Sequence, residues 1–149
     1  MKLIIETGEN NEILRKKAQP IVTLTKKILK LVKNMEETMF SADGVGLAAP
    51  QIGVSLKITV VSLDGKKAIP FLNPVITAHS DEMIVEQEGC LSLPERWEDV
   101  ARYKEITLRF MNIKGDAVAL KLEGFAARVL QHEIDHLNGI LFIDRVDLK

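Results

Sequence analysis

Several features that would assign a chain to a special class of protein are scarce in this sequence. Cys90 is its single cysteine, so no disulfide can form within the chain. The 20 basic residues are balanced by 21 acidic ones, which leaves a net charge of -1 and no basic stripe that would follow the phosphates of nucleic acid. We therefore expect neither disulfide stabilisation nor direct binding to nucleic acid.

Long apolar runs are missing as well. No run approaches the roughly 20 residues that a helix needs to cross a bilayer. Residues 1–8 become polar too early to serve as a signal peptide. We expect a cytoplasmic protein that does not associate with membranes.

The remaining composition is that of an ordinary globular domain. Hydrophobic residues make up 46% of the chain and charged residues 28%. A length of 149 residues is sufficient to bury a hydrophobic core without disulfides. Since the sequence shows no repeat, low-complexity segment or linker, we expect residues 1–149 to form one domain.

Two long helices and a short one are predicted. Residues 25–41 place apolar side chains at helical spacing with lysines on the other side, which indicates an amphipathic helix. The second long helix should cover residues 125–137 and end at residues 138–139, an Asn-Gly pair. A brief helical stretch at residues 12–17 should be stopped by Pro20.

Strands are predicted between and after the helices. In chain order they cover residues 58–62, 69–77, 82–88, 105–111, 117–123 and 140–143. We expect Pro70 and the Asn73-Pro74 step to divide the second strand into two short pieces. Pro94 should end the extended chain that follows the third strand. The alternating strands on either side of residues 114–116 should form a hairpin, and the whole pattern predicts an α+β fold.

The strongest chemical signal lies in the last predicted helix. His132 and His136 are one helical turn apart, so two imidazole nitrogens can bind one metal ion while Glu133 projects beside it. Two of the chain's three histidines form this pattern, which favours a metal site over a pair of surface histidines. Phe125 and Val129 share the same face, either as ordinary core or as the floor of a pocket for an unbranched apolar side chain.

A hydrolytic metal site needs a third ligand and an open coordination position. The acids downstream of His136, Asp144 and Asp147, do not offer the later-helix glutamate of thermolysin-like zincins, and no third histidine follows as in metzincins. Cys90 is the remaining candidate, because a thiolate and two imidazoles leave one position for water. The predicted ligands are therefore Cys90, His132 and His136.

A run of small residues at 43–53 stands out in a chain with only nine glycines. The run lacks the Gly-Lys-Ser/Thr ending of a phosphate-binding loop. We expect it instead to let the backbone of a substrate approach closely.

Three segments together resemble the signature motifs of the peptide deformylase family, in the family's order and with similar spacing. They are residues 44–51 (Gly-Val-Gly-Leu-Ala-Ala-Pro-Gln), 88–92 (Glu-Gly-Cys-Leu-Ser) and 131–136 (Gln-His-Glu-Ile-Asp-His). The resemblance implies short antiparallel sheets packed around a central helix that carries His-Glu-x-x-His. It also implies a catalytic domain that removes the N-formyl group from the N-terminal formylmethionine of nascent polypeptides and releases formate.

The resemblance implies a role for each motif. One divalent metal, ferrous iron in the cell with zinc, nickel or cobalt as alternatives, would be held by the three predicted ligands. Glu133 would act as general base and then as acid toward the leaving amine. The side-chain amide of Gln51 and the backbone N–H of Leu91 would stabilise the oxyanion.

Substrate binding is implied to be mostly through the backbone. The formyl-Met peptide would lie extended against Val45, Gly46 and Gly89, as an added strand. The methionine side chain would enter an apolar pocket formed in part by Val45, Phe125, Val129 and His132. The implied partners are N-formylated nascent peptides, with contact to the ribosome as a further expectation.

Some polar residues around these motifs are implied to support the ligands. Asp135 and Gln131 are expected in that role, and Glu88 is expected to pair with Arg102, unless the latter two form an ordinary surface ion pair. Trp97 is expected either to face the substrate or to pack at the rim. Two other functions are open at this point, a zincin-type metallopeptidase and a module that binds modified N-termini without turnover.

Overall fold

The computed structural model of the protein describes residues 1–146. Asp147, weighed above as a metal ligand, and the last residues of the predicted domain lie outside the described residues. Helices are α1 (Glu12–Arg15), α2 (Lys26–Ser41) and α3 (Gly124–Leu137), with short 3-10 helices η1 (Ala49–Ile52) and η2 (Phe142–Arg145). Strands are β1 (Gly46–Ala48), β2 (Ile58–Val61), β3 (Ile69–His79), β4 (Met83–Cys90), β5 (Leu93–Tyr103), β6 (Glu105–Met111) and β7 (Ala117–Glu123).

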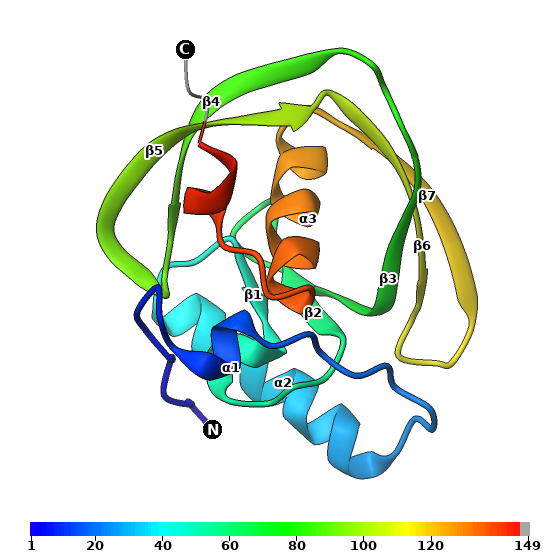
Figure 1. Ribbon diagram of the computed structural model, residues 1–149. Helices are drawn as coiled ribbons and strands as arrows, with labels where there is room; N and C mark the ends of the chain where they lie inside the picture. Colours follow the sequence, from blue (N-terminus) through cyan, green and yellow to red (C-terminus); the bar gives the residue numbers. More distant parts are fainter. Residues whose placement is uncertain (147–149) are drawn as a thin grey trace.

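Helix α3 lies at the centre, and the strands surround it (Figure 1). One sheet has the strand order β1-β2-β3-β6-β7, and the second consists of β4 and β5. Every strand pair in these two sheets is antiparallel. The predicted α+β fold, with short antiparallel sheets around a central helix, is confirmed.

The two faces of α3 meet different parts of the molecule. One face packs against the five-stranded sheet, where its Val129, Leu130 and Ile134 share a core cluster with Phe71 and Leu108. The opposite side is directed toward the β4–β5 hairpin, to which it is linked by polar contacts. The helix is therefore held in a fixed position between the two sheets.

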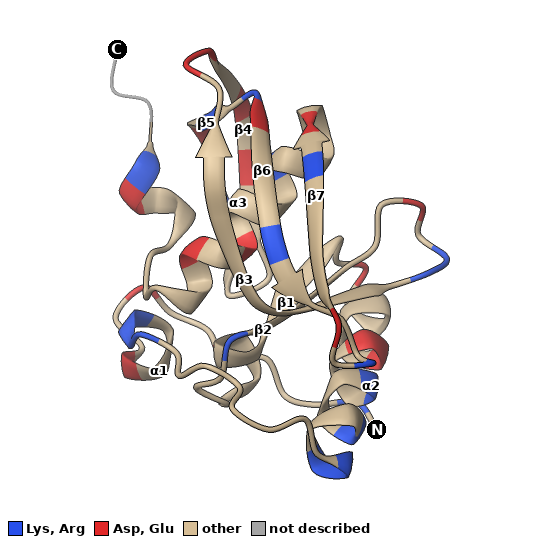
Figure 2. Ribbon diagram, turned by 90° about the vertical axis from the view of Figure 1, so that its right-hand side faces the viewer, with Lys and Arg blue, Asp and Glu red and all other residues tan. Residues whose placement is uncertain are grey.

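Helix α2 follows the sequence prediction closely. The Thr25 hydroxyl accepts a hydrogen bond from the backbone N–H of Ile28 at 3.2 Å, which caps the first turn. Val32, Met35 and Met39 are buried against β1 and β2, whereas the lysines of the helix are exposed. Figure 2 marks the basic positions along α2 in blue. The amphipathic helix predicted for residues 25–41 is thus confirmed.

The β6–β7 hairpin and the end of α3 also agree with the predictions. The two strands have the predicted bounds, and α3 is capped at Asn138, with Gly139 in the left-handed region at φ 73°. A side chain at Gly139 would collide with the backbone of Arg15, so a glycine is required there for packing as well. Helix α1 ends two residues earlier than predicted, because the chain then extends to let Ala18 N–H bind the carbonyl of Leu137 at 2.8 Å.

The predicted break in the strand at residues 69–77 is wrong, since β3 continues through both prolines. Asn73 takes a φ of 52°, and the pairing register shifts between Leu72 and Val75, so Pro74 lies in a bulge where its missing N–H is tolerated. The Asn73 side chain stabilises this bulge by two hydrogen bonds to the backbone of Ile21, at 2.7 and 2.9 Å.

Two more predictions require correction. Pro94 does not end the extended chain, because it is the second residue of β5, a strand that the sequence did not indicate. The segment at residues 140–143 is not a strand but leads into η2. Leu141 and Phe142 are both buried, whereas consecutive residues of a strand point to opposite faces. The Asp144 carboxylate also accepts a hydrogen bond from Leu141 N–H at 3.0 Å.

The small-residue run at 43–53 is partly regular. It contains β1, which pairs with β2, and η1, which contacts α3. Among residues 1–146, no helix combines the length and apolar character needed to cross a membrane.

Candidate metal centre

The three predicted ligands lie together in the structure. Cys90 ends β4, and His132 and His136 lie on adjacent turns of α3. One ligand atom from each residue lies within 4.8 Å of the other two. The Cys90 Sγ is 3.3 Å from Nε2 of His136. The donor set is therefore one sulfur and two imidazole nitrogens, a combination that suits a divalent transition metal with an open position.

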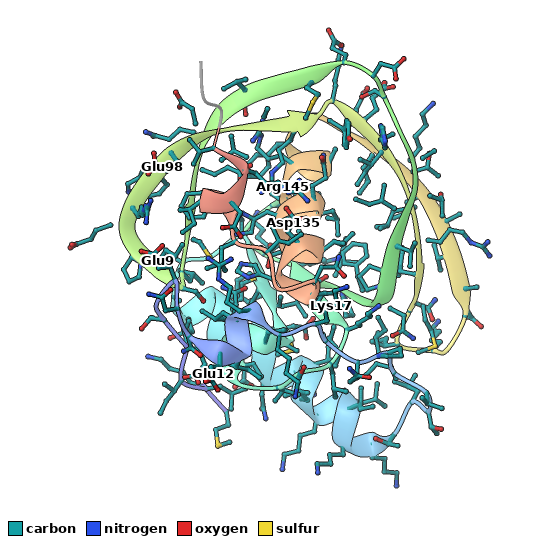
Figure 3. All side chains as sticks on the ribbon, in the orientation of Figure 1. Glu9, Glu12, Lys17, Glu98, Asp135 and Arg145 are labelled. Atoms are coloured by element: carbon teal, nitrogen blue, oxygen red, sulfur yellow. The ribbon has the colours of Figure 1, made fainter. Side chains whose placement is uncertain are left out.

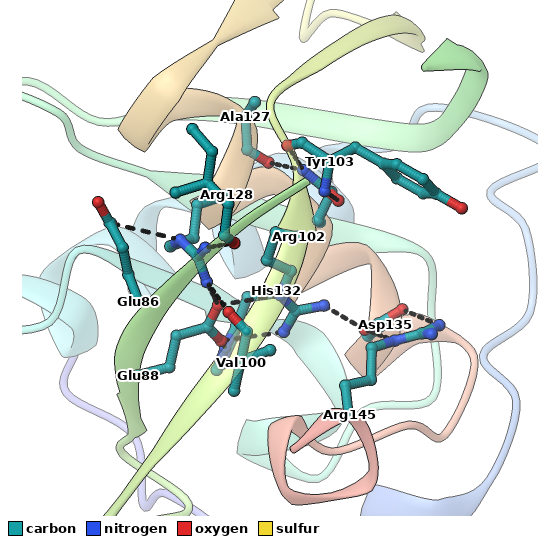
Figure 4. Close-up of polar contacts among 12 residues, drawn as sticks. Glu86, Glu88, Val100, Arg102, Tyr103, Ala127, Arg128, His132, Asp135 and Arg145 are labelled. Carbon is teal, nitrogen blue, oxygen red and sulfur yellow. Dashed lines mark hydrogen bonds and ion pairs between the residues drawn. The ribbon is translucent and has the colours of Figure 1, made fainter. Parts of the chain in front are cut away.

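A buried carboxylate orients the first histidine. Glu88 Oε1 lies 3.0 Å from Nδ1 of His132 (Figure 4). The other ring nitrogen, Nε2, is therefore left to bind a metal with Cys90 and His136. Arg102 binds the same carboxylate through two hydrogen bonds of 2.9 Å each. Glu88 is 7% exposed and Arg102 3% exposed, so the predicted pair is present and is not a surface ion pair.

Arg128 extends this network. Arg128 of α3 donates to Glu88, and also to the backbone carbonyls of Val100 at 3.0 Å and Ile84 at 2.6 Å. Since these carbonyls lie on β5 and β4, Arg128 joins the hairpin to α3. Sequence reasoning did not find this residue, although an arginine in an otherwise apolar helix segment was a detectable signal.

Asp135 is linked to His132 through Arg102 and Glu88. It accepts a hydrogen bond from Arg102 at 2.6 Å and another from Arg145 of η2 at 2.6 Å. Figure 3 shows Asp135 and Arg145 between α3 and η2. The Gln131 amide accepts a hydrogen bond from Tyr103 N–H at 3.0 Å and donates one to the Tyr103 carbonyl at 2.9 Å. Both residues predicted to support the ligands therefore connect α3 to β5, and Asp135 also connects α3 to η2.

The two histidine ligands differ in charge, and His132 must release a proton before it can bind a metal. Burial acts to raise the pKa of Glu88, but hydrogen bonds from His132 and Arg102 outweigh it and hold that pKa well below the ordinary value. Burial acts to lower the pKa of His132, but its contacts with Cys90 and Glu88 outweigh it and raise that pKa to about 10. Burial keeps the pKa of His136 well below its ordinary value, so this ring is neutral and able to donate an electron pair.

Glu133 is buried next to the ligand cluster. Its side chain is 4% exposed, and its Oε1 has no hydrogen-bond partner among the described residues. Burial raises the pKa of Glu133 to about 7, which suits a group that must both accept and release a proton. A Cβ at Gly46 would lie 2.6 Å from Oε2 of Glu133, so a side chain at this position would displace the carboxylate.

Gln51 is fixed at the other side of the cluster. Its Oε1 accepts a hydrogen bond from Ala48 N–H at 2.9 Å, and its Nε2 donates to Ser92 Oγ at 3.0 Å and lies 3.6 Å from the sulfur of Cys90. The amide NH₂ group therefore faces the ligands. Ser92 is fully buried, and its contact with Gln51 was not foreseen from the sequence. Leu91 lies beside Cys90, in the turn between β4 and β5.

A cavity of about 470 Å³ opens beside these groups. Every residue predicted to contact the substrate lines it, namely Val45, Gly46, Gly89, Phe125 and Val129. Gln51, Leu91, Cys90, His132 and Glu133 line it as well. The structure thus brings the predicted binding residues and the predicted reactive groups to one cavity.

Comparison with known proteins agrees with this arrangement. A family model described as polypeptide deformylase matches residues 1–149. The chain belongs to the polypeptide deformylase family. The peptide deformylase of Halothermothrix orenii is 51% identical over 135 residues, which is 90% of this chain and 87% of that protein. The peptide deformylase of Pseudothermotoga lettingae is 49% identical over 134 residues, 90% of this chain and 77% of that protein.

Solved structures of deformylases have the same fold. The crystal structure of peptide deformylase from Thermotoga maritima superposes with a TM-score of 0.96 at 40% identity, covering 99% of both chains. A class I type b peptide deformylase from Acinetobacter baumannii, bound to Met-Ala-Ser, superposes with a TM-score of 0.92 at 32% identity, covering 98% of this chain and 99% of that one. Membership of the deformylase family confirms the resemblance and rules out the zincin-type alternative.

Proposed function

We propose that this protein is a peptide deformylase, a metal-dependent hydrolase that removes the N-formyl group from the formylmethionine of nascent polypeptides. The observation that carries the proposal is the meeting of a three-ligand cluster, the buried carboxylate of Glu133 and the amide of Gln51 at one cavity. A module that only binds modified N-termini needs neither a base nor an oxyanion donor. The products are formate and a free amino-terminal methionine.

Cys90, His132 and His136 would hold the metal, and their donor atoms fit one divalent ion. When bound, the metal polarises the formyl carbonyl and increases the acidity of water. We propose ferrous iron as the ion used in the cell, although zinc, nickel and cobalt accept the same ligands. Elemental analysis of protein purified without oxygen tests this choice, and zinc as the sole stoichiometric metal would contradict it.

Glu133 would transfer the proton during hydrolysis. Its carboxylate accepts a proton from the water that attacks the formyl carbon, and it returns this proton to the amine nitrogen as the C–N bond breaks. The proposal is supported by the burial of Glu133 and by the pKa near neutrality that this burial causes. An Oε1 without a partner among the described residues is free to receive the proton.

Gln51 and Leu91 would stabilise the negative charge on the formyl oxygen. The Gln51 carbonyl oxygen is anchored by Ala48, so its NH₂ group is already directed at the cavity and needs little reorganisation. The hydrogen bond from Leu91 would come from its backbone N–H, next to the ligand Cys90. Removal of one such donor typically lowers kcat about 100-fold or more.

The substrate would bind as an extended strand along Val45, Gly46 and Gly89, with its methionine side chain directed toward Phe125 and Val129. The support for this arrangement is that all five residues line one cavity whose walls are largely apolar. Main-chain hydrogen bonds read little of the peptide sequence, so the enzyme would accept many nascent chains.

Formate release from formyl-Met-Ala-Ser tests the activity. The protein is purified under reducing, anaerobic conditions and loaded in turn with ferrous iron, nickel or cobalt. We expect stoichiometric formate from the formyl peptide and none from the matched acetyl-Met-Ala-Ser. The proposal is overturned if no metal form releases formate, and cleavage of the Met-Ala bond instead would identify a peptidase.

The location of the enzyme in the cell should follow that of its substrates. Because N-formylated chains are made on ribosomes, we propose that the enzyme acts in the cytoplasm and contacts the ribosome. Cosedimentation of the purified protein with ribosomes tests the contact, and recovery of the protein only in the supernatant would contradict it.

A further inference from the structure

None of the roles proposed above uses Trp97, the single tryptophan of the chain. Its side chain is 62% exposed and lines the cavity together with Gly89 and Leu91. Burial of an indole ring stabilises a fold strongly, so a tryptophan that leaves most of its surface in water adds little to stability. At the mouth of a binding cavity, such a ring is well suited to contact a ligand.

The β4–β5 hairpin is shaped to hold this ring over Gly89. Glu88 pairs with Glu98, and Cys90 pairs with Leu93. Between these two pairs, β4 contributes Gly89 alone, whereas β5 contributes residues 94–97. Such a bulge redirects side chains and is common next to functional sites. The extra residues of β5 therefore place Trp97 beside the ligand Cys90 instead of continuing a regular ladder.

The contact between Trp97 and Gly89 is direct. A Cβ at Gly89 would lie 2.6 Å from Cε3 of the ring and 2.8 Å from Cη2. The six-membered ring thus packs on the glycine backbone, while the rest of its surface stays exposed. The proposed substrate backbone lies along the same glycine, so the indole is adjacent to the path of the peptide.

The charge next to Trp97 is already compensated. Arg96 lies 3.2 Å from Glu98 and 3.6 Å from Glu9 in two ion pairs. Arg96 is therefore engaged with carboxylates of the protein. The exposed carboxylates of Asp43 and Glu95 also line the cavity, so Trp97 adds an apolar contact to a rim of mixed charge.

We infer that Trp97 is a specificity-determining residue, which favours peptides with an aromatic or large apolar side chain among the two residues after formylmethionine. An extended peptide advances about 3.3 Å per residue and alternates its side chains. With the methionine in the cavity, the next two residues pass Gly89 and reach the ring. This inference rests on the proposed deformylase activity, and it names the substrates that the enzyme processes fastest.

The test compares kcat/KM for formyl-Met-Ala-Ser, formyl-Met-Phe-Ser and formyl-Met-Ala-Phe. An added aromatic contact should raise kcat/KM about 3- to 10-fold for at least one of the two phenylalanine peptides. In Trp97→Ala this ratio should fall to about one, whereas Trp97→Phe should retain most of it. Ile113→Ala removes an exposed apolar side chain that does not line the cavity, and it should leave the ratio unchanged.

Fluorescence provides a readout that does not depend on turnover. Because Trp97 is the single tryptophan, its emission reports on this site alone. Titration with the product peptide Met-Phe-Ser should shift the emission to shorter wavelength and do so at lower concentration than Met-Ala-Ser. The inference is overturned if the kcat/KM ratios are equal in wild type and Trp97→Ala, or if saturating product leaves the emission unchanged. Absence of formate from every peptide would instead refute the deformylase activity.

Discussion

Glu88 shows how strongly a single residue can couple a proposed metal ligand to the rest of the fold. Its buried carboxylate is shared by His132, Arg102 and Arg128, which come from α3 and β5. Removing one partner of a buried ion pair leaves an uncompensated charge, which costs far more than an exposed pair ever contributes. The orientation of His132 therefore depends on residues that do not touch the metal position.

We predict that Arg102→Met lowers the free energy of unfolding by about 3 kcal/mol and weakens metal affinity about 10- to 100-fold. The reason is that Glu88 and Asp135 both lose a buried counter-charge. Urea unfolding and competition with a chelator measure the two effects. Arg96→Met is the matched control, because its exposed ion pairs should contribute less than about 1 kcal/mol. Equal losses in both variants would contradict the prediction.

Glu133→Gln separates proton transfer from metal binding. The amide has nearly the same shape but cannot accept a proton, so we expect kcat to fall roughly 100- to 10,000-fold. Elemental analysis should still find one metal ion per chain. Loss of the metal in this variant would mean that Glu133 is a ligand and not the general base.

At the level of single residues, the sequence predicted groups that are brought together by local spacing. It did not predict contacts between residues that are far apart in the sequence. His132, Glu133 and His136 were predictable because a helix fixes their common face, whatever surrounds it. Ser92 and Arg128 were missed because their contacts depend on how the β4–β5 hairpin lies against η1 and α3. Arg128 and Glu88, for example, are 40 positions apart in the sequence. A local sequence pattern cannot predict a contact across such a separation in sequence.

The helices and strands also differ in how well local sequence predicts them. The β6–β7 hairpin and α2 were predicted with nearly correct bounds, since their periodicity and turns are encoded within each segment. The continuity of β3 depends instead on Asn73, which bonds to the distant Ile21. Likewise, η2 replaces a predicted strand because Leu141 and Phe142 both find buried positions. Tertiary contacts decided each of these cases.

Helix η2 also carries a pH-dependent contact. Burial acts to raise the pKa of Asp144, but hydrogen bonds from Arg15 and the backbone of Leu141 outweigh it and lower that pKa below the ordinary value of 3.8. A carboxyl group whose pKa is lower in the folded state stabilises the fold above its unfolded-state pKa. That contribution disappears as the pH falls through the folded-state value.

We predict that Asp144→Asn destabilises the protein by less than about 1 kcal/mol at pH 7, because the pair with Arg15 is partly exposed. The difference from wild type should shrink below about pH 4 and vanish when Asp144 is protonated in both states. Urea unfolding at several pH values measures it. A double-mutant cycle with Arg15→Gln isolates the pair, and a difference that persists unchanged at low pH would contradict the assignment.

At the scale of the whole molecule, the proposed metal ligands come from parts that are otherwise packed separately. Cys90 belongs to the β4–β5 hairpin, and the two histidines belong to α3, which packs on the five-stranded sheet. Residues of α3 belong to two of the core clusters, whereas the hairpin packs with α1 and with Leu141 and Phe142 in a third. We therefore propose that residues 1–149 fold as one domain, in which metal binding stabilises the contact between hairpin and helix.

Thermal unfolding tests this proposal directly. A single domain should unfold in one cooperative transition, with equal calorimetric and van't Hoff enthalpies. Metal that binds only the folded state adds about 4 kcal/mol when it is present at roughly 1,000 times its Kd. In a domain of this size each kcal/mol raises the Tm by roughly 2–4 °C, so chelation should lower the Tm by about 8–16 °C. Cys90→Ala lacks the ligand from the hairpin, and its Tm should respond far less to chelation. Two separate transitions, of which only one responds to metal, would show that hairpin and sheet unfold independently.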